Sequence, residues 1–282
     1  MSENRHPLGL RTLFFTEMWE RMSYYGMRGI LVLFMTASIT NGGLDFNNAS
    51  ASAIYGIYAA AVYLMALPGG WIADNIFGQQ KTILFGGIVI MFGHLSLAIP
   101  NMTFFYFGLI LVVIGTGLLK PNISAIVGGL YEKKTSLRES GFTIFYMSIN
   151  IGSILGFFIC GYLGENIGWH YGFGAAGIGM FLGVLQYKLN LNSLGGVGLL
   201  PANQVSEERK KQYKKNTLII SVIISLFIFS GLFGFWKINP VPLANVLTFI
   251  IGSISLIYFV YLYFFGQLNN DEKKRVILIF TL

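Results

Sequence analysis

Long apolar segments recur along this chain, and they constrain its fold more than any other feature. A helix that crosses a bilayer needs roughly 20 mostly apolar residues. Eight segments of about that length predict spanning helices, and a ninth begins near Val276. The eight predicted spans are residues 13–36, 51–73, 81–99, 103–130, 141–163, 169–190, 216–236 and 243–266.

The composition supports this interpretation. Only 11% of the 282 residues are charged and 54% are hydrophobic, whereas about a quarter of the residues of a soluble domain are charged. The chain therefore has too little polar surface to cover a water-facing globule of its size. An all-α membrane protein is predicted.

Basic residues gather in alternate connectors between these predicted helices. The N-terminus and every second connector carry Lys and Arg, whereas Lys237 is the one basic residue in the remaining connectors. The positive-inside rule then predicts a cytoplasmic N-terminus in a multi-pass membrane protein. The same placement argues against a nucleic-acid partner for the net charge of +7. The basic connectors contain Arg5 and Arg11; Lys81; Lys133, Lys134 and Arg138; Lys188, Arg209, Lys210, Lys211, Lys214 and Lys215; and Lys273, Lys274 and Arg275.

Four regions are predicted. Residues 1–190 form a six-helix transmembrane bundle with mostly short connectors. Residues 191–215 contain glycine and then many charges, so they are predicted to be a cytoplasmic linker. Residues 216–266 form two additional transmembrane helices that lack charge within their apolar runs, which favours a lipid-facing scaffold. Residues 267–282 are the start of a further bundle.

The first predicted helix carries four ionisable groups within the segment FFTEMWERMSYYGMRGILVLF. On a helix with 3.6 residues per turn, Glu17, Glu20, Arg21, Tyr24 and Arg28 share an arc of about 100°. Tyr25 lies at the edge of that arc. Charge at the bilayer centre costs at least about 2.5–3.5 kcal/mol per group, so this face must meet a bundle interior or a watery cavity. A structural salt bridge that locks helices together is the alternative.

Three further polar residues are predicted at membrane depth. Lys120 lies inside GTGLLKPNISAIVGG, so its ammonium needs an anion, either a carboxylate of the first helix or an anionic ligand. Asn150, within FTIFYMSINIGSILG, can bond a substrate or a neighbouring helix. Tyr63, five residues before Pro68, is a weaker signal.

Asp74 and Lys81 flank a short glycine-containing turn in GGWIADNIFGQQKT. Opposite charges at two adjacent helix ends are interpreted as an ionic latch at a moving cytoplasmic surface.

Catalytic and metal chemistry find little support in the sequence. His6, His94 and His170 are far apart, and His94 and His170 stand at segment ends where one hydrogen bond is expected to satisfy each. The one cysteine, Cys160, is predicted to be a buried apolar residue. Neither a nucleotide loop nor an acid–nucleophile pair is recognised, so no enzyme activity, metal or cofactor is expected.

These segments together resemble the proton-dependent oligopeptide transporters, a branch of the major facilitator superfamily. EMWERMSYY is similar to that family's first-helix signature, FTIFYMSINIGS to its fifth-helix signature and LLKPNIS to its fourth-helix lysine motif. GGWIADNIFGQQK resembles the superfamily's loop between helices 2 and 3. The resemblance covers roughly residues 10–190, and the two uncharged helices resemble a pair that bacterial members insert between their halves.

The resemblance implies roles for residues singled out above. Glu17, Glu20 and Arg21 would couple proton movement to transport, with the proton as the coupling ion. The peptide-binding residues would be Arg21, Tyr24, Tyr25, Tyr63, Lys120 and Asn150, with Arg21 and Lys120 meeting the peptide carboxylate. Met22 departs from the aromatic residue that is usual in the family.

Two functional interpretations remain open at this point. In the first, the chain is part of a longer transporter that carries di- or tripeptides with protons across the cytoplasmic membrane. In the second, it is a truncated, non-transporting membrane fragment or scaffold that needs a partner half. The family has a second six-helix bundle, and this sequence ends as that bundle would begin.

Overall fold

The computed structural model describes residues 5–132, 135–203, 205–232, 234–235, 239–266 and 268–281. These residues form nine α-helices joined by short connectors, and no strand occurs among them. The helices are α1 (Leu8–Thr36), α2 (Asn48–Ile72), α3 (Gln79–Leu97), α4 (Met102–Leu130), α5 (Arg138–Asn166), α6 (Trp169–Leu189), α7 (Glu207–Leu232), α8 (Pro240–Phe265) and α9 (Asn270–Thr281).

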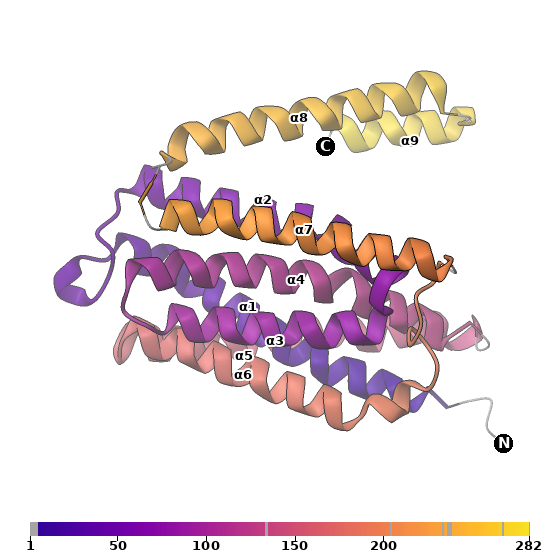
Figure 1. The fold of residues 1–282 in the computed structure, drawn as a ribbon, viewed down its shortest axis with the longest axis horizontal. Coiled ribbons are helices and arrows are strands. Elements are labelled where there is room, and N and C mark those ends of the chain that lie inside the picture. Colours follow the sequence, from indigo (N-terminus) through magenta and orange to yellow (C-terminus); the bar gives the residue numbers. More distant parts are fainter. Residues whose placement is uncertain are drawn as a thin grey trace.

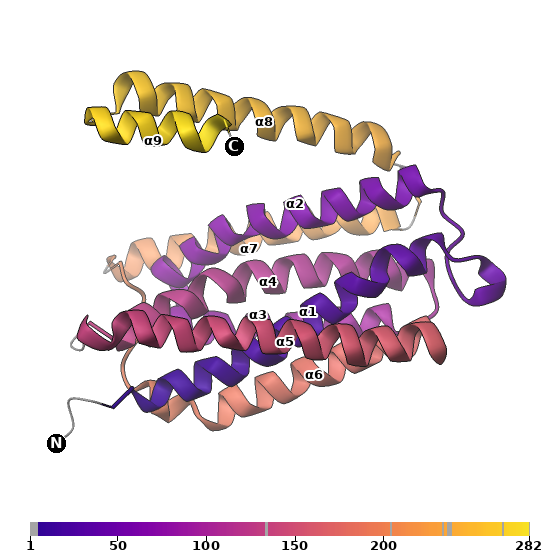
Figure 2. The same cartoon turned by 180° about the vertical axis from the view of Figure 1, so that it is seen from behind.

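Helices α1 to α6 form the main bundle, and α1 crosses it diagonally between α5 and α6 (Figure 1, Figure 2). The most extensive contacts join α3 to α4, α1 to α5, α1 to α6 and α2 to α4. Helix α8 touches the bundle through α2, and α9 lies against α8. The predicted six-helix bundle with two further long helices is therefore confirmed.

Glycines let α1 and α5 approach closely over most of their length. A methyl group on Gly152 would clash with the carbonyl oxygen of Met18, and one on Gly156 would clash with the backbone of Gly26. The two helices run parallel, because contact positions rise together along both. Small residues at a helix interface allow this approach inside a membrane, where packing rather than water drives association.

Helix α4 continues through Pro121 without ending. Proline has no backbone donor, so the carbonyl of Gly117 loses its bond four residues on. That carbonyl lies against Gly69 of α2, where any side chain would overlap it. The proline thus helps create the close α2–α4 crossing beside Lys120.

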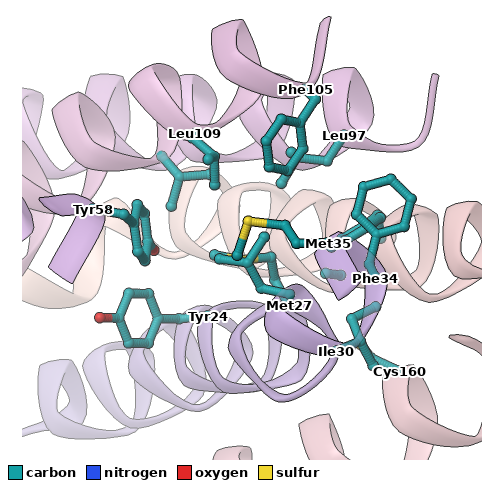
Figure 3. Packing of buried hydrophobic residues seen from close by; sticks show 14 of the residues in the cluster. Tyr24, Met27, Ile30, Phe34, Met35, Tyr58, Leu97, Phe105, Leu109 and Cys160 are labelled. Carbon is teal, nitrogen blue, oxygen red and sulfur yellow. The ribbon is translucent and has the colours of Figure 1, made fainter. Parts of the chain in front are cut away.

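An apolar cluster with residues from each of the helices α1 to α6 fills part of the bundle (Figure 3). Phe34 packs edge-on against Phe173, with ring centroids 5.2 Å apart. Cys160 is fully buried and lies where a side chain on Gly26 would be. Its expected role as a small buried residue is confirmed.

Six helical segments are long and apolar enough to cross a membrane, namely those that contain α2, α3, α4, α5, α7 and α8. Helices α1 and α6 do not reach this apolarity, although they pack inside the same bundle. The charges of α1 explain its lower hydropathy, and part of the charged face meets α2, where Arg28 bonds Tyr55 and Tyr24 packs beside Tyr58. Helices α7 and α8 bury none of their apolar window, which fits the expected lipid-facing scaffold.

The segment after α6 differs from the predicted linker at residues 191–215. Its first part packs on the bundle, where the hydroxyl groups of Thr12 and Ser193 share a 2.7 Å hydrogen bond. Its charged second part is helical, because α7 begins at Glu207 and not near residue 216. Charged residues at the start of a spanning helix can remain in water while the helix continues, so charge alone did not mark a linker.

Some residues used above lie outside the part of the chain that the structure describes. Lys133, Lys134 and Lys237, which contribute to the orientation prediction, are among them. So are Gln204 in the predicted linker and residue 236 at the end of the seventh predicted span.

Replacing Gly152 with alanine should destabilise the bundle by about 1–3 kcal/mol, as overpacking of a tight core does. The added methyl group would force α5 away from Met18 and Arg21. Thermal unfolding of the purified protein in detergent should show a midpoint several degrees lower. Gly161→Ala is the matched control on the same helix, because nothing lies within 4 Å of a methyl group there. Equal midpoints for the two variants would contradict tight α1–α5 packing.

Candidate functional site

The charged face of α1 forms a buried triad. Arg21 Nε lies 3.1 Å from Glu17 Oε1 and also contacts Glu20 Oε2. All three residues are at most 3% exposed. The helical spacing predicted this grouping, and the structure places it in the bundle interior.

The triad leaves one atom of each member without a hydrogen-bond partner among the described residues. These atoms are Glu17 Oε2, Glu20 Oε1 and Arg21 Nη2. An unpaired polar atom in a buried site costs free energy, so such atoms are unusual in a native core. With two carboxylates and one guanidinium, the triad carries an excess negative charge that a bound proton would neutralise.

Tyrosine rings surround the cations of the bundle. Arg21 Cζ lies 5.0 Å from the ring centroid of Tyr24 and 5.8 Å from that of Tyr25. Arg28 Cζ lies 5.7 Å from Tyr24 and 5.1 Å from Tyr55. Such cation–π contacts stabilise a charge that has lost water.

Tyr55 and Tyr58 of α2 are two residues that sequence reasoning missed. Arg28 Nε donates a 2.5 Å hydrogen bond to the Tyr55 hydroxyl. Tyr58 is buried, with its ring 6.5 Å from that of Tyr24. The sequence does contain a pattern that could have indicated them. Two tyrosines three residues apart lie on the same face of an otherwise apolar helix.

Lys120 and Tyr63 form a second contact of the predicted site. Lys120 Nζ lies 4.9 Å from the Tyr63 ring centroid. Tyr63 is 64% exposed. Asn150 is also exposed, on the helix that packs against Arg21 through Gly152. The structure therefore groups Lys120 with Tyr63 and leaves Asn150 on an open face of α5.

Asp74 and Lys81 form no ion pair with each other in the described residues. Asp74 lies in a short π-helix, Ala73–Phe77, and its backbone oxygen accepts a 2.9 Å bond from the amide of Asn203. The neighbouring Gln80 side chain donates to the carbonyls of Gly195 and Val197. Hydrogen bonds from the segment after α6, and not a direct Asp74–Lys81 ion pair, hold this connector in the conformation seen here.

One hydrogen bond was expected for each of His94 and His170, and the structure shows one for His170 alone within the described residues. His170 Nδ1 lies 3.3 Å from the carbonyl oxygen of Leu97, as expected for a satisfied ring. His94 is fully buried, and neither ring nitrogen has a hydrogen-bond partner among the described residues. The prediction for His94 was wrong because the α3 face that carries it points into the bundle. The described residues include no group of three or more potential metal ligands.

Comparison with known proteins identifies the type of protein. The model of the POT family (PTR2) matches residues 80–190. This match confirms the resemblance inferred from the motifs.

The relatives are transporters. The chain is 41% identical to the uncharacterized transporter YclF of Bacillus subtilis over 274 residues, covering 96% of this chain and 54% of the relative. It is 39% identical to the peptide transporter YePEPT of Yersinia enterocolitica over 286 residues, covering 98% of this chain and 56% of the relative. A di-/tripeptide transporter of Lactococcus lactis is 40% identical over 278 residues, with 96% and 55% covered. The chain thus spans about half the length of these curated relatives.

Solved structures show the same fold. A peptide transporter POT in complex with sulfate superposes with a TM-score of 0.83 at 40% identity, covering 96% of this chain and 56% of that one. A mutant of a peptide transporter POT in complex with alafosfalin gives a TM-score of 0.82, also at 40% identity, with 96% and 55% covered. The chain is a multi-pass membrane protein with the helical arrangement of the major facilitator superfamily.

Replacing Arg21 with methionine should strongly destabilise the bundle, by about 3–5 kcal/mol, because two buried carboxylates lose their counter-ion. Adding Glu17→Gln and Glu20→Gln to that variant should restore much of the stability, since no net buried charge remains. Thermal unfolding in detergent measures both effects. Arg28→Met serves as the control, because Arg28 is partly exposed and contacts no carboxylate in the described residues. An Arg21→Met midpoint equal to that of the wild type would contradict a charged buried triad.

Proposed function

We propose that the chain forms the first bundle of a proton-coupled symporter for di- and tripeptides. The observation that carries the proposal is the buried Glu17–Arg21–Glu20 triad. In it, each carboxylate keeps one oxygen that has no hydrogen-bond partner among the residues that the structure describes. Curated relatives named as di-/tripeptide transporters, at 40% identity, supply the substrate class. The function is transport and not catalysis, with the proton as coupling ion and no other cofactor.

The chemistry of coupling follows from the pairing. A carboxylate beside an arginine can exchange its salt bridge for a proton. When Glu17 or Glu20 takes a proton, the hold on Arg21 weakens, and the guanidinium can then bind another anion. The carboxylate of a peptide is such an anion, so proton uptake and peptide binding favour each other.

The remaining predicted residues complete the proposed peptide site. Lys120, held over Tyr63, offers a second cation for the peptide carboxylate. Tyr24, Tyr25 and Asn150 offer aromatic and amide contacts. Asp74 and Lys81 are proposed to pair in another conformation of the transport cycle, as an ionic latch. The protein is proposed to reside in the cytoplasmic membrane with its N-terminus in the cytoplasm.

A second candidate function has one observation in its favour. The chain spans about half of its relatives, and Tyr63, Tyr146 and Asn150 are exposed on its surface. Alternating access moves one bundle against another. A bundle that presents such a face can therefore act as a non-transporting scaffold that requires a partner half.

Uptake of a labelled dipeptide into proteoliposomes tests the proposal. The 282-residue chain and the product of the complete native reading frame are reconstituted separately, with and without an inward proton gradient. Gradient-driven uptake is expected from the latter, and Glu20→Gln should lower it by at least tenfold. Glu165→Gln is the matched control, because Glu165 is exposed at the end of α5.

The outcomes separate the two candidates. Uptake by the complete product but not by the 282-residue chain shows that the chain needs a partner half. An absence of uptake from both favours the scaffold. Gradient-driven uptake that Glu20→Gln leaves unchanged excludes proton coupling through this residue.

A further inference from the structure

Tyr58 carries a buried hydroxyl group that nothing described so far uses. The residue is 4% exposed, and its hydroxyl has no hydrogen-bond partner among the described residues. Leaving a hydroxyl unpaired in a buried site is unfavourable, and phenylalanine would fill the same space without that cost. The hydroxyl is therefore expected to find a partner in another state of the protein.

The surroundings of Tyr58 narrow the choice of that partner. Its ring packs beside that of Tyr24 (Figure 3). The Tyr24 ring centroid in turn lies 5.0 Å from Arg21 Cζ. Arg28 is already bonded to Tyr55. Among the described residues, Arg21, which contacts Tyr24, has an unpartnered Nη2, and Glu20, which pairs with Arg21, has an unpartnered Oε1. Thr116 Oγ1 of α4 is also unpartnered among these residues.

Charged and titratable groups reach Tyr58 mainly from α1. Helix α4 has one charged residue, Lys120, which lies over Tyr63, and one tyrosine beside the apolar cluster that contains Tyr58, namely Tyr106. Helix α8 has tyrosines but no charged residue. The connector after α2 carries Asp74, and α3 carries Lys81 and the buried His94. The α1 groups that act electrostatically on Tyr58 are Glu20, Arg21, Tyr24 and Arg28.

We infer that Tyr58 is a positioning residue for the triad, and that its hydroxyl bonds Glu20, directly or through one water, when Glu20 is neutral. The inference rests on the proposed function, since it concerns the protonated state of the coupling site. In the charged state Arg21 holds Glu20, as the structure shows. Once Glu20 is neutral, the pull of Arg21 weakens, and the carboxyl group can turn toward α2.

The bond between Tyr58 and neutral Glu20 predicts the direction in which the pH dependence of uptake should change. A bond that exists only with neutral Glu20 increases the affinity of Glu20 for its proton. Tyr58→Phe removes that bond, so protonation needs a lower pH. Half-maximal uptake by the complete native product should move to lower pH by about half a unit to one unit.

A double-mutant cycle tests the bond without any need for transport. Glu20→Gln supplies a neutral side chain of the same shape as the protonated acid. Tyr58→Phe alone should change the unfolding midpoint in detergent by less than about 2 °C, because no bond is lost. In the Glu20→Gln background, the same change should lower the midpoint by about 3 °C or more.

Tyr187→Phe is the matched control, because the Tyr187 hydroxyl donates a 3.1 Å hydrogen bond to the backbone oxygen of Gln80, away from the triad. It should lower the midpoint equally in both backgrounds and leave the pH profile of uptake in place. Additive effects of Tyr58→Phe and Glu20→Gln would overturn the inference. The double-mutant cycle can support the Tyr58–Glu20 bond even if no uptake is measured. In that case the proposed transport function would be contradicted, but the inferred bond would not.

Discussion

The salt bridges that Arg21 makes with two glutamates inside an apolar bundle set the conditions for the rest of the structure. In a membrane, such charges need protein on every side, because lipid offers no hydrogen bonds. The charged face of α1 is therefore turned into the bundle, where Tyr24 and Arg28 contact tyrosines of α2 and Arg21 packs against Gly152 of α5. A helix with this composition could not occupy a lipid-facing position such as that of α8.

Close packing makes this burial possible. Gly152 allows α5 to pass beside Arg21, and Gly26 makes room for Cys160. On the other side of the bundle, Pro121 and Gly69 bring α2 close to α4. The polar groups of α1, α2 and α4 thereby share one region of a protein that is otherwise apolar. Glycine residues at the helix contacts thus allow close packing, and this packing brings the charged residues together.

Local pattern predicted much of the fold and part of the site. Apolar runs predicted the long helices, and the spacing of Glu17, Glu20 and Arg21 predicted that they meet. Pattern failed where the partner is distant in sequence: the Asn203 contact to the Asp74 connector and the Gln80 contacts to the segment after α6 are examples. The prediction that His94 makes a hydrogen bond was wrong for a related reason. Helices distant in sequence bury this side chain, and the residues near it in the sequence do not reveal that burial.

The sequence by itself determined that this chain spans a membrane, which face of α1 is charged, and which family signatures it carries, because these properties depend on composition and helical period. Tertiary structure decided what each charge touches. Arg28 bonds Tyr55, Lys120 lies over the ring of Tyr63, and the Tyr58 hydroxyl next to Tyr24 has no hydrogen-bond partner within the described part of the chain. Those outcomes depend on how far α1, α2 and α4 approach one another, and for α2 and α4 the backbone contact between Gly69 and Gly117 sets that approach.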